Sequence, residues 1–311
     1  MRVTAFSAAE IPDFNGDTVI VTGANSGIGR AAAHAFAAAG ARVVLAVRDA
    51  GKGEAAAAAM PGRTPGATPG ATPGATPGAT EVRVLDLASL ASVREFAAGW
   101  SGDIRLLVNN AGVMVPPLTR TADGFESQFG VNHLGHFALT NLLLPHVTGR
   151  VVTVSSSVHR VGRIDFGDLN WERKRYAAWR AYAQSKLANL LFTAELQRRL
   201  SAAGARVLSN AAHPGYAATN LQSHSQSPVL EFLMGRIGNP LLAQDAAGGA
   251  LPVLYAAVAD IPGNSFAGPG RLMGMRGAPK LAARSAAARD PETARRLWTV
   301  SEELTGVTFP L

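Results

Sequence analysis

Tyr182 and Lys186 are the residues of this sequence best suited to acid–base chemistry. They lie four residues apart in a segment, 180–200, whose leucines recur with helical spacing, so the two side chains are expected on one helix face. A phenol is a poor acid or base at neutral pH because its reference pKa is about 10, but a fixed ammonium nearby is expected to lower that pKa. The pair is therefore a candidate proton donor for carbonyl or alcohol chemistry. A surface tyrosine and lysine on an amphipathic helix would show the same spacing.

A glycine-rich turn at 22–29 follows an apolar run at 18–21 and precedes a predicted helix at 30–39. Glycines let the backbone approach a pyrophosphate, and the free N–H groups at the helix start favour its negative charge. An ordinary strand-to-helix loop is the alternative, but a further strand at 42–47 favours dinucleotide binding. The predicted cofactor contacts in this turn are Gly23, Asn25, Ser26, Gly27, Ile28 and Gly29.

Later strands also end in small or polar residues, at the edge where α/β sheets bind ligands. Asp86 ends a strand at 82–87, where its carboxylate would meet the adenine edge of a nucleotide or cap the next helix. The turn 109–112 follows a strand at 105–108, and its glycine, Gly112, leaves room for a bulky cofactor. A strand at 150–154 ends in three serines, and the long segment before it, 122–146, is predicted to be helical and contains Asn132.

The alternation of strands and helices predicts the architecture. Repeated six or seven times, it indicates an α/β fold with a doubly wound parallel sheet of the Rossmann type, in a single domain spanning 1–311. Four Thr-Pro-Gly-Ala copies within 61–80 bar helix and strand, so we interpret that segment as a flexible insert; a domain boundary is the alternative. The C-terminal helix is predicted from Asp290 to Gly306.

Composition excludes several functional classes. The 311 residues contain no cysteine, and the seven histidines lack zinc-binding spacing, so no metal site is predicted. The formal charge of +7 comes from scattered arginines, which indicates an anionic cofactor rather than a nucleic acid. No apolar run is long enough to span a bilayer, and residues 1–16 do not resemble a signal peptide, so a cytoplasmic location is expected.

In combination, these motifs resemble the short-chain dehydrogenase/reductase family, in the branch of retinol dehydrogenases and related carbonyl reductases. The resemblance covers nearly the whole chain except the Thr-Pro-Gly-Ala insert. It is carried by Thr22-Gly23 with Gly27 and Gly29, Asp86-Leu87, Asn109-Asn110-Ala111-Gly112, Val154-Ser155-Ser156, Tyr182 with Ser185-Lys186-Leu187-Ala188-Asn189, and His213-Pro214-Gly215.

The resemblance implies a catalytic group and further cofactor contacts. Tyr182 would exchange the proton, Ser156 would bond the substrate oxygen, and Lys186 would hold the ribose and lower the tyrosine pKa. Asn132 would position a water beside Lys186, and the neighbouring Ser157 is an alternative to Ser156. Cofactor contacts are implied for Asp86, Leu87, Asn110, Ala111, Gly112, Tyr182, Lys186, Pro214, Gly215 and Thr219.

The dinucleotide preference follows from the end of the second strand. NAD-selective members of such folds carry an acidic residue there, whereas this chain has Val47 followed by Arg48. A guanidinium can pair with a 2′-phosphate, which predicts NADP over NAD. In the alternative, Arg48 pairs with Asp49 or faces solvent.

The substrate is expected to be a lipophilic small molecule, because the apolar run in 220–244 lies where this family has a substrate lid. A core helix or a homo-oligomer interface would carry the same run. Trp171, Tyr176 and Trp179 either line the pocket or anchor a loop. Two other functions stay open: a nucleotide-sensing protein without turnover, and a reductase of a conjugated or tetrapyrrole double bond.

Overall fold

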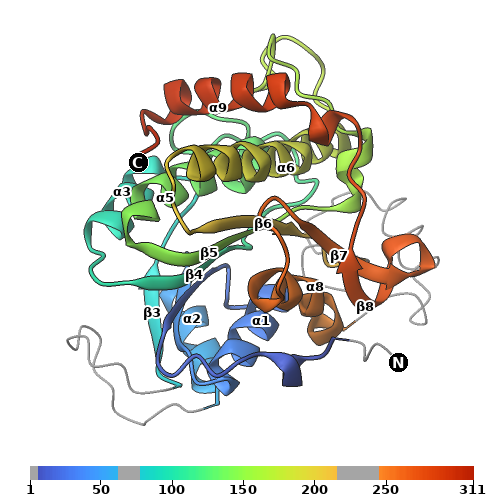
Figure 1. Cartoon of the computed structure of the whole chain (residues 1–311). Helices are drawn as coiled ribbons and strands as arrows, with labels where there is room; N and C mark the ends of the chain where they lie inside the picture. Colours follow the sequence, from blue (N-terminus) through green and yellow to red (C-terminus); the bar gives the residue numbers. More distant parts are fainter. Residues whose placement is uncertain (1–5, 62–77, 216–244) are drawn as a thin grey trace.

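Eight strands form one sheet in the computed structural model, which describes residues 6–61, 78–215 and 245–311 (Figure 1). The strand order is β3-β2-β1-β4-β5-β6-β7-β8. All neighbouring strands run parallel except β8, which is antiparallel to β7. The strands are β1 (Thr18–Thr22), β2 (Arg42–Val47), β3 (Thr80–Val84), β4 (Ile104–Asn109), β5 (Val147–Val154), β6 (Leu208–Ala212), β7 (Phe266–Arg271) and β8 (Arg276–Leu281).

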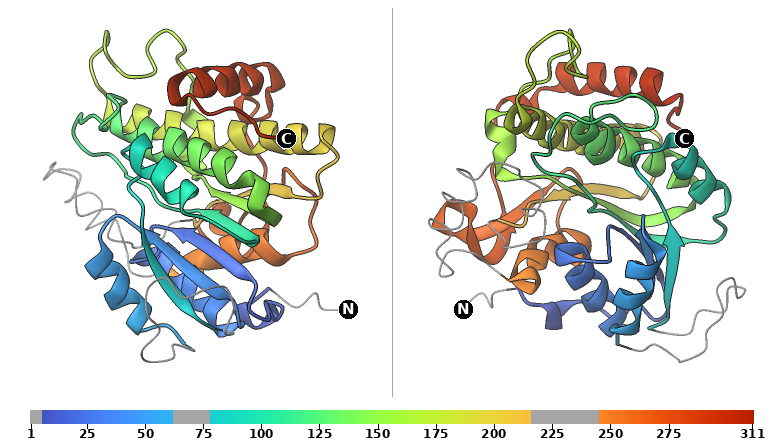
Figure 2. Two further views of the ribbon diagram at one scale, coloured as in Figure 1. Left: turned by 90° about the vertical axis from the view of Figure 1, so that its left-hand side faces the viewer. Right: turned by 180° about the vertical axis from the view of Figure 1, so that it is seen from behind.

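Helices cover both faces of this sheet, which confirms the doubly wound α/β prediction (Figures 1 and 2). One layer consists of α1 (Gly27–Ala38), α2 (Ala50–Ala58) and α8 (Ala246–Val258). The other consists of α3 (Leu90–Ala98), α5 (Gly135–Leu143), α6 (Ala178–Ala202) and α9 (Pro291–Thr305), with the short α4 (Ser127–Phe129) before α5. Because the sheet is buried on both sides, its central strands are continuous apolar runs rather than alternating ones.

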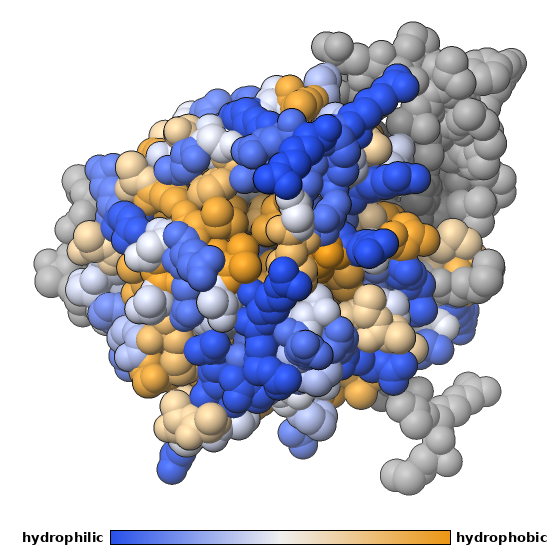
Figure 3. Space-filling model, turned by 90° about the horizontal axis from the view of Figure 1, so that it is seen from above, coloured by the Kyte–Doolittle hydropathy of each residue, from blue (hydrophilic) through white to orange (hydrophobic). Residues whose placement is uncertain are grey.

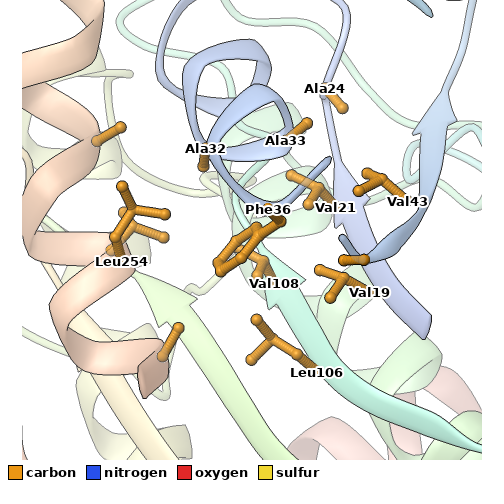
Figure 4. Close-up of a cluster of buried hydrophobic side chains, with 14 of the residues drawn as sticks. Val19, Val21, Ala24, Ala32, Ala33, Phe36, Val43, Leu106, Val108 and Leu254 are labelled. Carbon is orange, nitrogen blue, oxygen red and sulfur yellow. The ribbon is translucent and has the colours of Figure 1, made fainter. Parts of the chain in front are cut away.

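The core under α1 shows how small residues bring a helix onto the sheet. Ala32 and Ala33 of α1 are fully buried, so this helix packs closely over the sheet around Phe36 (Figure 4). Leu254 of α8 joins the same cluster. Phe14 meets the Phe36 ring edge-on with centroids 5.5 Å apart, within the range of about 4.5–7 Å typical of such pairs. These contacts hold α1, which the glycine turn precedes, against the sheet.

On the opposite face, α9 packs on α6. Trp298 is buried and stacks on Phe192, with ring centroids 5.7 Å apart, and Arg199 lies over the same indole at 4.5 Å. As predicted, α9 begins after the capping side chain of Asp290 and ends at Gly306, whose φ of 60° is left-handed. From the α9 side, the surface shows hydrophilic side chains around an area of apolar ones (Figure 3).

Three expectations about segments need correction. The helical segment predicted for 122–146 begins too early: α4 starts at Ser127, and a π-helical turn, Gly130–Leu134, joins it to α5. The insert predicted for 61–80 ends too late, because Thr80 already belongs to β3 and the Ala79 carbonyl accepts a bond from Val43. The 82–87 strand ends at Val84, two residues before Asp86.

The predicted lid, 220–244, lies outside the described residues, as does most of the repeat insert. Among the helices of the described ranges, none is both long and apolar enough to cross a membrane.

Candidate active site

The candidate site lies where the carboxyl ends of β1, β4 and β5 meet. β1 and β4 are neighbours in the sheet, with chain connections that leave in opposite directions from this point. Parallel sheets bind ligands at this kind of switch point, because the loops on either side part and leave a crevice. The glycine turn, the 109–112 turn and the three serines follow these three strands.

The geometry of the glycine turn fits a pyrophosphate. Gly23 and Gly27 have left-handed φ values of 67° and 53°. A Cβ added to Gly29 would lie 2.5 Å from the Gly23 carbonyl oxygen, so only glycine allows this close approach. Ser26 is the N-cap residue of α1 but makes no side-chain capping bond, which leaves the first N–H groups of the helix available to an anion. Asn25 is partly buried and Ile28 buried in the same turn.

Thr22 ties this turn to the end of β4. Its hydroxyl accepts bonds from the backbone N–H groups of Asn110 and Ala111, both at 2.9 Å. The Asn110 amide in turn donates to the Thr22 carbonyl at 2.8 Å. The two turns that would hold the dinucleotide are therefore held together before it binds.

His136 extends this connection to Asn132. Its Nδ1 lies 3.1 Å from the Asn132 carbonyl oxygen and its Nε2 2.9 Å from the Thr22 hydroxyl. Because a carbonyl only accepts, Nδ1 carries the proton and Nε2 accepts from Thr22. Burial lowers the pKa of His136 to about 4, which keeps the imidazole neutral. This role of His136 was not predicted from the sequence, where its signal is the spacing of four between Asn132 and His136.

Asn132 is held in place through its side chain. The amide accepts from the Val113 N–H at 2.8 Å and donates to the Val113 carbonyl at 3.0 Å. It also donates to the Ser185 hydroxyl at 2.9 Å, which donates to the Tyr182 carbonyl at 2.8 Å. A Cβ at Gly112 would lie 3.0 Å from Asn132 Oδ1 and 3.6 Å from the Lys186 ammonium, so Gly112 keeps this corner open.

Tyr182 and Lys186 share one face of α6 beside Ser156, as predicted. The Ser156 side chain hydrogen-bonds the Tyr182 phenol, whereas Ser157 begins a 3-10 turn and is exposed. The Lys186 ammonium is 5.7 Å from the Tyr182 ring centroid and donates to the Val154 carbonyl at 3.1 Å. Three of the four catalytic candidates thus meet at the end of β5, and Asn132 reaches them through Ser185.

The expected effect of Lys186 on Tyr182 is not observed. Burial raises the pKa of Tyr182 to about 12, and only the Ser156 hydrogen bond opposes that rise. Burial also lowers the pKa of Lys186 to about 8. The prediction of a depressed phenol pKa was wrong for this structure, since removal of the phenol from water outweighs the attraction of an ammonium nearly 6 Å away.

The residues predicted to contact the adenine half follow β2 and β3, which β1 and β4 separate from the catalytic group at the end of β5. Asp86 accepts a bond from the Ala88 N–H at 2.9 Å, while Ser89 caps α3, so Asp86 forms a local turn rather than the cap. Leu87 is buried. Arg48 is exposed, and Asp49 caps α2 and pairs with Lys52 at 3.7 Å.

Two further predicted contacts follow β6. Gly215 has a left-handed φ of 72°, and a Cβ there would lie 2.5 Å from the Met275 carbonyl oxygen. Pro214 lies directly before it, after the buried His213, whose pKa burial lowers to about 4. Thr219 lies outside the described residues.

The three aromatic residues between the serine and tyrosine motifs differ in role. Trp171 is buried, edge-on to Tyr176 and under the Lys174 ammonium, so it anchors the loop. The Tyr176 hydroxyl donates a hydrogen bond to the Glu126 carboxylate at 2.9 Å, and burial raises the pKa of Tyr176. Trp179 instead is 39% exposed and meets the Tyr182 ring edge-on at 6.2 Å.

Comparisons with known proteins agree with this geometry. The family model described as short chain dehydrogenase matches residues 17–229. Human retinol dehydrogenase 13 is 44% identical over 98% of this chain and 88% of its own length, and human retinol dehydrogenase 12 is 42% identical over 94% and 88%. The crystal structure of an uncharacterized protein from Mycobacterium Paratuberculosis is 51% identical, with a TM-score of 0.83 over 99% of this chain and 100% of that one.

Proposed function

Because the chain belongs to the short-chain dehydrogenase family, we propose that it is an NADP-dependent enzyme that interconverts a carbonyl and an alcohol on a hydrophobic small molecule, with Tyr182 as general acid and base. Its family makes it an NAD(P)-dependent oxidoreductase acting on CH–OH groups. The cofactor preference, the substrate and the residue roles are the proposal.

The contact that carries the proposal is the bond between Ser156 and the Tyr182 phenol, beside the buried Lys186. The bound dinucleotide would supply or accept hydride at the substrate carbon. Tyr182 would then give a proton to the substrate oxygen, or take one from it, while Ser156 donates a hydrogen bond to that oxygen. Lys186, held by the Val154 carbonyl, would bind the ribose and bring positive charge toward the phenol. Asn132, fixed by Val113, would hold a water between Lys186 and solvent.

The end of β2 supports NADP. Val47 is buried and uncharged, so nothing there repels a 2′-phosphate. Within residues 6–61, 78–215 and 245–311, Arg48 has no carboxylate at ion-pair distance, because Asp49 pairs with Lys52. An exposed guanidinium at this position suits charge-assisted bonds to a phosphate.

The cofactor assignment is tested by kcat/KM for NADPH and NADH. The unaltered protein is expected to prefer NADPH, and Val47→Asp with Arg48→Ala is expected to shift the ratio at least about 100-fold toward NADH, since one substitution adds a charge that repels the 2′-phosphate and the other removes a charge that attracts it. The matched control is Arg30→Ala, which removes an exposed arginine of α1 instead of the one after β2. Equal efficiency with NADH before any substitution would contradict the assignment.

A lipophilic substrate is supported by Trp179, which leaves a large apolar face exposed beside Tyr182. The relatives named retinol dehydrogenase suggest a retinoid as one member of the class. The test is oxidation of NADPH by the purified protein against retinoids, steroids, quinones and aliphatic aldehydes. Turnover of short polar carbonyls alone would contradict the lipophilic class, and bound cofactor without any turnover would favour the sensor alternative.

Location and assembly also stay predictions. We expect the protein in the cytoplasmic fraction of its cell, and light scattering would show whether it forms a homo-oligomer.

A further inference from the structure

A cavity of about 630 Å³ lies away from the catalytic edge, between the second half of α6, the start of β7, the end of β8 and the start of α9. Ala194, on its wall, is about 18 Å beyond Tyr182 along α6, at about 1.5 Å of rise per residue. Its volume is within the range of about 300–1,000 Å³ that small-molecule sites occupy. The mechanism proposed above makes no use of it.

The floor of this cavity is apolar. Phe266, Ala288 and Ala294 line it and are buried in the surrounding core, while Leu281 at its mouth is 50% exposed. A ligand that seats on this floor needs an apolar part, because burying a purely polar group against it would leave hydrogen bonds unmade.

The carboxylates around the cavity are already engaged. Glu195 accepts from Arg198 at 2.6 and 2.8 Å and from Arg199 at 2.9 Å. Asp290 caps α9, accepting from the Glu292 N–H at 3.0 Å and the Thr293 hydroxyl at 2.6 Å. Glu195 is therefore neutralised by arginines of its own helix, and the Asp290 oxygens are directed at the start of α9 rather than at an arginine.

Arg284 and Arg289 are the cations left over. Arg284 is partly buried and donates to Asn264 Oδ1 at 2.6 Å, which fixes its guanidinium. Burial and the like charge of Arg289 both lower the pKa of Arg284. Across the described part of the chain, no carboxylate lies within ion-pair distance of either guanidinium. Two unneutralised guanidiniums over an apolar floor present positive charge to a ligand.

We propose that this cavity binds an amphipathic carboxylate. The carboxylate group lies between Arg284 and Arg289, where guanidiniums can hold it through charge-assisted bonds, and the apolar chain lies on Phe266, Ala288 and Ala294. The site is separate from the catalytic edge and does not depend on the proposed reaction.

Octanoate titrated into the full-length protein by calorimetry tests the site. Saturable binding of one octanoate per chain is expected, weaker by about 10-fold for both 1-octanol, which lacks the charge, and acetate, which lacks the chain. Arg289→Gln is expected to weaken octanoate binding about 10-fold, since it removes one charge-assisted contact. Arg289 is exposed, so the substitution leaves the fold intact. Arg295→Gln, an exposed arginine of α9 outside the cavity, is the control and is expected to bind as the unaltered protein does.

Three results would overturn the proposal. No saturable binding up to ~10 mM, where affinity falls below the range of specific sites, would show that the cavity is not a site. Equal binding of inorganic phosphate would make it a simple anion site. Binding that survives Arg289→Gln but disappears with saturating NADP would place octanoate at the catalytic edge.

Discussion

Helix α6 carries Lys186 in its first half and Glu195 in its second half, and both side chains are buried. Two guanidiniums, from Arg198 and Arg199, neutralise Glu195. Among the described residues, the Lys186 ammonium donates to the Val154 carbonyl and pairs with no carboxylate, and burial lowers its pKa to about 8. A neutralised buried charge is a structural element, whereas one left without a counter-charge is costly to bury and is available to a ligand or a reaction. The same helix therefore provides reactivity at one end and stability at the other.

Removal of the phenol should give the largest effect. Tyr182→Phe is expected to lower kcat about 10³-fold, because general acid–base catalysis contributes that order of rate, while the Kd for NADPH stays within about 2-fold. Steady-state rates and fluorescence titration measure the two. Lys186→Ala should impair both quantities, since the ammonium is proposed to hold the ribose as well. If Tyr182→Phe kept most of the activity, Tyr182 would not be the acid.

The buried ammonium predicts a pH-dependent stability. The pKa of Lys186 is about 8 in the folded protein and about 10.5 when unfolded, so between these values the unfolded chain binds more protons and the free energy of unfolding rises with pH. Relative to Lys186→Met, the unaltered protein should gain about 2 kcal/mol from pH 7 to pH 10. Urea unfolding across this range measures it. Tyr182 acts with the opposite sign only above pH 10, because its pKa is raised from 10 to about 12. A constant difference between the two proteins would show that Lys186 is not desolvated.

At the other end of α6, loss of the carboxylate should reduce stability rather than rate. Glu195→Gln is expected to lower the free energy of unfolding by about 1–2 kcal/mol, less than the ~3–5 kcal/mol for breaking a fully buried ion pair, because Arg198 is half exposed and can regain water. Urea unfolding gives the difference, and kcat should stay unchanged. Glu303→Gln, at an exposed position of α9, should change neither quantity. A loss of kcat in folded Glu195→Gln would show that the second half of α6 contributes to catalysis as well as to stability.

The smallest effect is expected far from α6. Deletion of 64–77 should leave kcat/KM unchanged, because Pro61 and Gly78 flank the insert at the amino edge of the sheet, opposite the site. Gly78 and Ala79 are kept, since both bond the β2 side of the sheet. Enzyme assays with thermal melts compare the two proteins, and a large loss of activity with an unchanged melt would mean that the insert contributes to the site.

The sequence predicted features that depend on neighbours along the chain. Runs of Val and Ile gave β1, β2 and β5, and Asp290 followed by Pro291 gave the start of α9. It did not predict β7 and β8, because 266–271 reads FAGPGR, and glycine and proline are rare in strands. The structure places that segment in the sheet through its parallel pairing with β6.

Features that depend on tertiary packing were beyond prediction. A Cβ at Gly130 would meet Thr121 Cγ2 at 2.5 Å, and one at Gly135 would meet the Leu87 carbonyl oxygen at 2.6 Å, so close packing surrounds the π-helical turn that carries Asn132. The same holds for the pKa of Tyr182, whose direction is decided by burial, which no local spacing reveals. The positions of the motif residues could therefore be predicted from the sequence, but the pKa of Tyr182 could not.

The packing of α9 on α6 also bears on how the protein folds as it is synthesised. Phe192 and Phe137 lack their ring contacts with Trp298 until the ribosome has released that residue. Chains fold from the N-terminus as they emerge, so a nascent chain shorter than about 300 residues exposes an aromatic surface on an otherwise complete sheet. That surface is the kind that chaperones bind and that drives aggregation, which makes the last helix decisive for solubility during synthesis.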